Sequence, residues 1–147
     1  MKARSWNVRL SEEIRENKDG VFVTLTFNEE SINELTNYIS SKYKGKRFNI
    51  KENEIATLAV RRFLERWRKK HKKSVKHWLI TELGHEGTKR IHLHGIIFTK
   101  NKEDIAKIWG YGYVFLGTWV NEQTINYIIK YVTKTDPDNK YYTPRIS

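Results

Sequence analysis

The stretch "VKHWLITELGHEGTKRIHLHGIIF", residues 75–98, predicts the hairpin around which the rest of the fold is arranged. Residues 75–82 and 90–98 are rich in β-branched, aromatic and aliphatic side chains that alternate with polar ones, which is typical of half-buried strands. The segment between them, "LGHEGTK", carries the glycines of a hairpin loop. The two segments therefore predict a pair of antiparallel strands.

Two histidines lie on the second of these strands, in the motif "IHLHG". Side chains alternate between the two faces of a strand, so His92 and His94 face one way while Ile91, Leu93 and Ile97 face the other. Two imidazoles on one face can hold a divalent cation through one ring nitrogen each. A pair of polar residues on a solvated strand face is the alternative interpretation.

Glu82 strengthens the metal interpretation. If the hairpin turns around Gly87, Glu82 pairs directly with His92 on the same face, and a slip of a single residue would remove it. Two histidines and a carboxylate with open positions suit Mn²⁺ or Mg²⁺, and the same set also occurs at catalytic zinc. The other histidines and a loop glutamate lack such a pattern, and we interpret them as structural or solvent-facing: His71, His77, His85 and Glu86.

The remaining elements predict an α+β fold with an antiparallel sheet in a single domain, residues 1–147. A capping box at Ser31–Glu34 predicts that a helix begins there, and Gly110 predicts where another ends. The tail "KYYTPRIS" has no evident structural end, as expected of a piece cut from a longer chain. The other expected strands are 21–27 and 113–116, the expected helices are 31–40, 54–72, 101–109 and 122–134, and 41–53 is expected to be a basic loop.

The last expected helix holds a repeated pattern, "YIIKYVTK", residues 127–134. At about 100° per residue, Tyr127, Lys130, Tyr131 and Lys134 share one face, and the aliphatic residues occupy the opposite one. The tyrosines are therefore not placed as core residues. They are interpreted either as part of a solvated amphipathic face or as two phenol nucleophiles. Since a free phenol has a pKa of about 10, attack on a phosphodiester would need the neighbouring cations and a metal.

The charge of the chain favours a polyanionic partner. Lys and Arg number 28 against 17 Asp and Glu, which gives a net charge of +11 and a pI of 9.8. There is no apolar run long enough for a membrane span, and the absence of cysteine fits a cytoplasmic protein. Aromatic residues could stack on unpaired bases. The expected DNA-binding residues are the basic ones of 41–53 and of the long helix: Lys44, Lys46, Arg47, Arg61, Arg62, Arg66, Arg68 and Lys69.

Together, "VFVTLTF", "WLITE", "IHLHG" and "YIIKYVTK" resemble the motifs of the HUH endonucleases, the nicking enzymes of rolling-circle replication, conjugation and some transposition. The closest resemblance is to replication initiators of microvirus-type single-stranded DNA phages, over roughly residues 20–140. It implies a five-stranded antiparallel sheet of ferredoxin-like or RRM-like character with helices packed on it. It also implies a metal on one face, with the tyrosine helix lying over it.

The resemblance also implies roles for individual residues. His92 and His94 match the family's metal-binding histidines, Glu82 matches the acidic third ligand, and Tyr127 and Tyr131 match a two-tyrosine nucleophile motif. Tyr131, with its lysine and the following turn, fits the single-tyrosine form best and is expected to nick first. The implied activity is metal-dependent nicking and joining of single-stranded DNA or an origin hairpin through a 5′-phosphotyrosine. A monomer is expected, with host replication proteins as further candidate partners.

Two other functions are compatible with the same residues. A non-catalytic nucleic-acid-binding module would use the sheet, the basic helix and the aromatic residues without chemistry. A metal phosphodiesterase would use an activated water in place of tyrosine. Formation of a covalent protein–DNA bond separates these alternatives.

Overall fold

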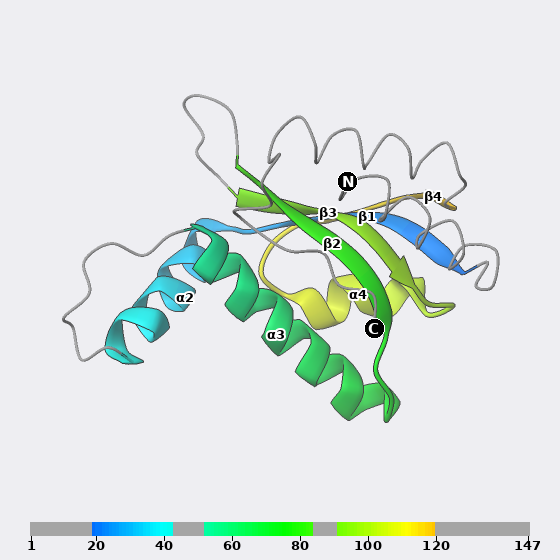
Figure 1. Cartoon of the computed structure of the whole chain (residues 1–147), viewed down its shortest axis with the longest axis horizontal. Helices are drawn as coiled ribbons and strands as arrows, with labels where there is room; N and C mark the ends of the chain where they lie inside the picture. Colours follow the sequence, from blue (N-terminus) through cyan, green and yellow to red (C-terminus); the bar gives the residue numbers. More distant parts are fainter. Residues whose placement is uncertain (1–18, 43–51, 84–90, 120–147) are drawn as a thin grey trace, which may run out of the picture.

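The computed structural model describes residues 19–42, 52–83 and 91–119 of the chain (Figure 1). The helices and strands alternate in an α+β order. In sequence they are β1 (Gly20–Thr26), α2 (Glu29–Lys42), α3 (Glu52–His71), β2 (Lys76–Leu83), β3 (Ile91–Phe98), α4 (Lys102–Trp109) and β4 (Val114–Trp119).

The described strands form one antiparallel sheet of four strands in the order β2-β3-β1-β4. The predicted hairpin is β2 and β3, and β1 pairs with the other side of β3. The five strands implied by the family resemblance are not confirmed, because the part of the chain that the structure describes contributes four to the sheet. The strand β3, which carries both histidines, therefore lies inside the sheet with a hydrogen-bonded neighbour on each side.

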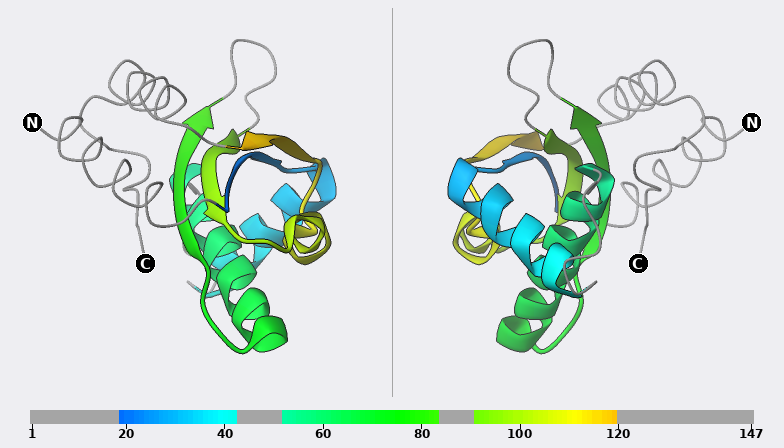
Figure 2. Two further views of the ribbon diagram at one scale, coloured as in Figure 1. Left: turned by 90° about the vertical axis from the view of Figure 1, so that its right-hand side faces the viewer. Right: turned by 90° about the vertical axis from the view of Figure 1, so that its left-hand side faces the viewer.

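All three described helices lie on the same side of the sheet, which curves around them (Figure 2). The residues of β3 that face them are Ile91, Leu93 and Ile97, which are almost fully buried in one core with Phe63 and Trp67 of α3. The residues between them, His92 and His94, consequently face the opposite side. The alternation read from the sequence is confirmed, and it separates the hydrophobic core from the histidines.

The start of α2 differs from the expected one. The helix begins at Glu29, because the Asn28 side chain accepts a hydrogen bond of 2.8 Å from the backbone N–H of Ser31. Asn28 is thus the N-cap, and Ser31, expected to cap the helix, lies in its first turn. The end of α4 is as predicted, since Gly110 adopts the left-handed conformation with φ 66°. The expected helix 122–134 lies outside the described residues.

Arg66 of α3 holds the end of α4 in place. Its guanidinium donates to the backbone carbonyls of Ile108, at 2.7 and 3.0 Å, and of Trp109, at 2.9 Å. It also donates to the hydroxyl of Tyr111 at 3.1 Å. These are carbonyls that a helix end leaves without intrahelical donors. Arg66, expected to contact DNA, is therefore engaged in packing α3 against α4.

The other link between these helices is ionic and predicts a pH dependence. The carboxylate of Asp104 lies 3.2 Å from the Lys70 ammonium and 2.9 Å from the His71 ring. Burial raises the pKa of Asp104, but Lys70 and His71 outweigh it and hold that pKa below its ordinary value of 3.8. A carboxyl group with a lowered pKa stabilises the fold above its unfolded-state pKa, and this contribution is lost as the pH falls through the folded-state value.

We therefore expect Asp104→Asn to lower the melting temperature by a few degrees at neutral pH and to have little effect at strongly acidic pH. Thermal unfolding of both proteins between neutral and strongly acidic pH measures this. An equal loss at all pH values would show that the ion pair does not stabilise the α3–α4 contact.

Candidate metal centre

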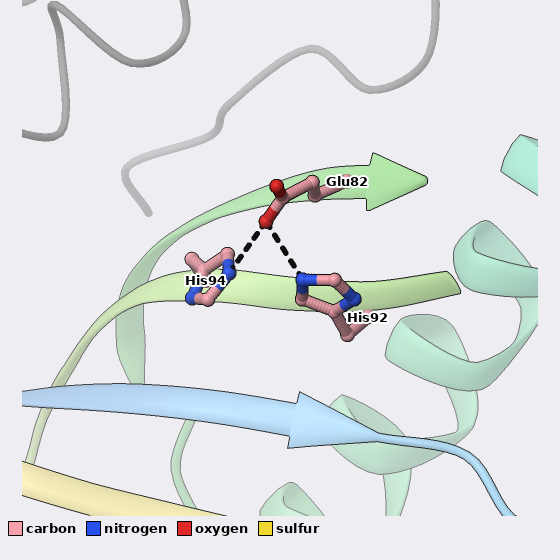
Figure 3. Close-up of side chains that lie close together, drawn as sticks. All are labelled: Glu82, His92 and His94. Carbon is pink, nitrogen blue, oxygen red and sulfur yellow. Dashed lines mark hydrogen bonds and ion pairs between the residues drawn. The ribbon is translucent and has the colours of Figure 1, made fainter. Parts of the chain in front are cut away.

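Three side chains on the side of the sheet away from the helices point at one another (Figure 3). The carboxylate oxygen Oε2 of Glu82 lies 2.7 Å from Nε2 of His92 and 2.7 Å from Nε2 of His94. The two imidazole rings are 4.7 Å apart between centroids and nearly perpendicular, at 85°. Among the described residues this is the one cluster of three side chains with the geometry of a metal site.

Strand pairing brings the cluster together. Glu82 is paired with His92 and Ile80 with His94 across the β2–β3 ladder, so the register expected from the hairpin is confirmed. The side chain of Glu82 is 9% exposed and those of His92 and His94 are 25% and 26% exposed. The carboxylate is therefore held in the protein while both imidazoles still reach solvent, as a site that receives a substrate requires.

The protonation of the cluster follows from these contacts. A carboxylate only accepts hydrogen bonds, so each short contact places a proton on the histidine Nε2. Burial, followed by the neighbouring His92, lowers the pKa of His94, while Glu82 partly opposes this shift. At neutral pH His94 therefore carries a single ring proton, and loss of that proton from Nε2 leaves a lone pair for a cation.

The donor set fits a divalent metal ion. Metal–ligand distances of about 2.1 Å place the ligand atoms of one ion roughly 3 Å apart. The three candidate ligand atoms lie within 4.8 Å of one another, so small side-chain rotations would bring all three onto one ion. Two imidazoles and a carboxylate leave coordination positions for water or a phosphate oxygen. Glu82, His92 and His94 could thus bind a divalent cation, whose identity the ligands do not determine.

Thr24, on β1, supports the site from behind, and the sequence analysis did not identify it. Its hydroxyl lies 3.1 Å from Nδ1 of His94, and the two residues are directly paired across the β1–β3 ladder. When Nε2 of a histidine binds a metal, the other nitrogen carries the ring proton and needs an acceptor. The Thr24 hydroxyl can accept that proton and so fix both the tautomer and the orientation of His94.

We expect Thr24→Val to weaken Mn²⁺ binding about tenfold, because valine keeps the shape of threonine and removes the acceptor. Isothermal titration of the metal into both proteins measures this. Thr26→Val is the matched control, since the Thr26 hydroxyl lies on the same strand but donates to the Tyr113 carbonyl at 2.7 Å. Equal effects of the two substitutions would contradict the role assigned to Thr24.

One wall of the site is apolar. Trp78, Ile80 and Ile96 are on the same face as the histidines by strand pairing, and they are 1%, 4% and 0% exposed. Ile80 is the direct cross-strand neighbour of His94. Apolar neighbours lower the local dielectric, which strengthens the interaction of the ligands with a cation and of that cation with an anionic substrate.

The remaining predicted site residues are placed in part. Arg61, Arg68 and Lys69 are exposed on α3, which lies on the other side of the sheet from the histidines. Arg62 contacts Glu34 at 3.1 Å and lies over the Tyr38 ring at 4.6 Å. His77, interpreted as structural, is buried, and its Nδ1 lies 3.0 Å from the Val75 carbonyl. The predicted residues outside the described ranges are Lys44, Lys46, Arg47, His85, Glu86, Tyr127, Lys130, Tyr131 and Lys134.

Comparison with known proteins gives one match. The family model of the replication-associated protein ORF2 matches residues 20–136, which include all of the described strands and helices. No curated protein and no solved structure matches the chain. None of the helices in the described ranges is long and apolar enough to cross a membrane.

Proposed function

The chain belongs to the family of the replication-associated protein ORF2, and from this premise we propose that it nicks and rejoins single-stranded DNA to start rolling-circle replication. The observation that carries the proposal is the convergence of Glu82, His92 and His94 on one face of the sheet. A replication protein with such a site has the means to act on a phosphodiester. The resemblance to HUH endonucleases of single-stranded DNA phages supports the specific reaction.

In this proposal Glu82, His92 and His94 hold a divalent ion, Mn²⁺ or Mg²⁺. When bound, the ion supplies Lewis-acid polarisation of the scissile phosphate and neutralises charge on its oxygens. The residues of the chain do the remaining work. Glu82 contributes negative charge that favours the cation, and Thr24 keeps the His94 ring oriented towards it.

The proposed nucleophile is the phenol oxygen of Tyr131, with Tyr127 as the second. It forms a bond to the phosphorus as the bond from phosphorus to the 3′ oxygen breaks, and the 5′ phosphate stays on the tyrosine. The phenol gives up its proton and the departing 3′ oxygen takes one up, so a free 3′ hydroxyl results. Lys130 and Lys134, each three residues after a tyrosine, would stabilise the negative charge on the phenol oxygen.

The phosphotyrosine conserves the energy of the broken bond. A 3′ hydroxyl can therefore attack the same phosphorus, release the tyrosine and reseal a strand without another energy source. A second tyrosine allows a new junction to be cut while the first still holds DNA. We propose that the free 3′ hydroxyl primes DNA synthesis by replication proteins of the host, in the cytoplasm of the cell that carries the DNA.

A labelling experiment tests the proposal and separates it from its alternatives. A pool of single-stranded oligonucleotides of random sequence, labelled at the 3′ end, is incubated with the protein and Mn²⁺ and run on a denaturing gel. The proposal predicts a labelled band at the position of the protein, because the downstream fragment stays on the tyrosine. A pool labelled at the 5′ end should give free fragments that a polymerase can extend.

The tyrosine variants complete this test. Tyr127→Phe/Tyr131→Phe should lose the labelled protein band and still bind DNA, since only the nucleophilic oxygens are removed. Cleavage without any protein band would indicate a phosphodiesterase that uses water. Binding without cleavage of any sequence in the pool would indicate a non-catalytic module, and either result would overturn the nicking proposal.

A further inference from the structure

Two large aromatic side chains are exposed beside each other at the start of β4. Tyr113 is 73% exposed and Phe115 is 57% exposed, although aromatic rings are usually among the most buried parts of a protein. Their ring centroids are 5.1 Å apart and the ring planes differ by 34°. They therefore form a continuous aromatic surface, which we name the Tyr113–Phe115 pair.

This pair lies on the same side of the sheet as the candidate metal centre. Phe115 is paired directly with Thr24 across the β1–β4 ladder, and Thr24 is paired directly with His94 across the β1–β3 ladder. Directly paired residues of antiparallel strands project to the same side. With strands about 4.8 Å apart, two spacings place the backbone of Phe115 about 10 Å from that of His94, a distance that one or two nucleotides span.

The pair is also held firmly from below. The backbone N–H of Thr26 donates to the Tyr113 carbonyl at 2.9 Å, and the Thr26 hydroxyl donates to the same carbonyl at 2.7 Å. Two donors on one carbonyl restrain the chain just where it enters β4. Rings on a restrained backbone lose little conformational freedom on binding a partner, which favours a role in recognition.

We propose that the Tyr113–Phe115 pair stacks on unpaired bases next to the phosphate that the metal centre engages. The proposal rests on the proposed function and adds to it the site that holds the bases. Among the partners that exposed rings can bind, unpaired DNA fits best. The chain carries a net charge of +11, which favours a polyanion, and a single strand offers flat bases at intervals that match neighbouring rings.

Stacking on bases needs no particular sequence, because every base has a flat face. The pair would therefore position a strand over the site for any flanking sequence. Phosphate contacts from basic residues would add affinity without fixing which base lies where. In this arrangement the aromatic pair sets the distance from the held bases to the scissile phosphate.

The test uses the full chain and measures DNA binding without chemistry, in the absence of metal. The variant Tyr113→Leu/Phe115→Leu keeps apolar side chains and removes both aromatic rings. Fluorescence anisotropy gives its dissociation constant for a mixed-sequence single-stranded oligonucleotide and for an abasic oligonucleotide of equal length. We expect binding of the base-containing strand to weaken about tenfold and binding of the abasic strand to stay within about twofold.

Tyr38→Leu is the matched control, since Tyr38 is 47% exposed but belongs to α2, on the other side of the sheet. It should bind both strands as the wild type does. Mn²⁺ affinity of the double variant, measured by titration, should be unchanged, which shows that the fold and the metal centre are intact.

Unchanged DNA binding by the double variant, or an equal loss for the abasic strand, would overturn the stacking proposal. The labelled protein band of the wild type is scored separately. If that band forms and the stacking result fails, the nicking proposal stands alone. If the band never forms and the base-dependent loss is seen, the aromatic pair binds single strands in a protein that does not nick them.

Discussion

Replacing His94 with alanine is expected to abolish Mn²⁺-dependent nicking and to weaken Mn²⁺ binding by at least about 100-fold, more than the loss of an outer hydrogen bond costs. The substitution removes one of three ligand atoms and leaves a cation with Glu82 and His92 alone. Without a bound cation the phosphate is not polarised, and the rate of adduct formation should fall roughly a thousandfold. Titration of the metal and a time course of the labelled protein band measure the two effects.

Glu82→Gln gives a graded version of the same prediction. Glutamine keeps the size of the side chain and an oxygen that can accept hydrogen bonds, but it lacks the negative charge. We expect Mn²⁺ affinity to fall about tenfold or more, because a neutral oxygen attracts a divalent cation less strongly than a carboxylate does.

His71→Gln is the matched control for both substitutions. His71 also contacts a carboxylate, that of Asp104 at 2.9 Å, but it belongs to α3 rather than to the cluster on the sheet. Its replacement should leave metal affinity and nicking near the wild-type level. If His94→Ala bound Mn²⁺ as tightly as His71→Gln does, the metal centre would have to be placed elsewhere.

Gly95→Ala is expected to give the largest loss of stability of any small substitution in the sheet. A Cβ atom at Gly95 would lie 1.8 Å from the backbone carbonyl oxygen of Trp78 and 2.8 Å from the Cα of Leu79. Both atoms belong to the backbone of β2, so no side-chain rotation can relieve the clash. We expect the free energy of unfolding to fall by about 3 kcal/mol or more, as in severe overpacking, which urea unfolding would measure.

Gly20→Ala is the control for this prediction. At Gly20 the nearest atom to an added Cβ is Cε1 of the Phe98 ring, at 3.0 Å, and a ring can shift where a backbone cannot. Its cost should stay below about 1 kcal/mol. Wild-type stability of Gly95→Ala would mean that β2 lies further from β3, and the pairing of Glu82 with His92 would then be in question.

The hairpin and the metal cluster could be predicted because they depend on local rules. Alternation along a strand places His92 and His94 on one face, and a short connection fixes which residue of the first strand lies opposite. Glu82 follows from these two facts alone. Thr24 could not be found in this way, because its contact with His94 joins residues 70 apart in sequence and depends on the pairing of β1 with β3.

Helical periodicity misjudged Arg66 for a related reason. A helical wheel places it on the polar face of α3, which suggested contact with DNA. The wheel contains no information on the helix packed against that face, and the carbonyls at the end of α4 take up the guanidinium. The start of α2 shows a competition between two local signals, in which Asn28 rather than Ser31 supplies the cap. Long-range packing and the choice between adjacent caps are thus the parts that sequence patterns left undetermined.

The central claim, that a tyrosine of this chain becomes covalently joined to DNA under control of the metal centre, is tested most directly by mass spectrometry. The wild-type protein is incubated with single-stranded DNA and Mn²⁺, digested with protease and nuclease, and searched for peptides that carry nucleotide. We predict a peptide from residues 122–134 with a 5′-linked nucleotide on Tyr131 or Tyr127, and its absence from His94→Ala. Cleaved DNA without any nucleotide-bearing peptide would contradict this account.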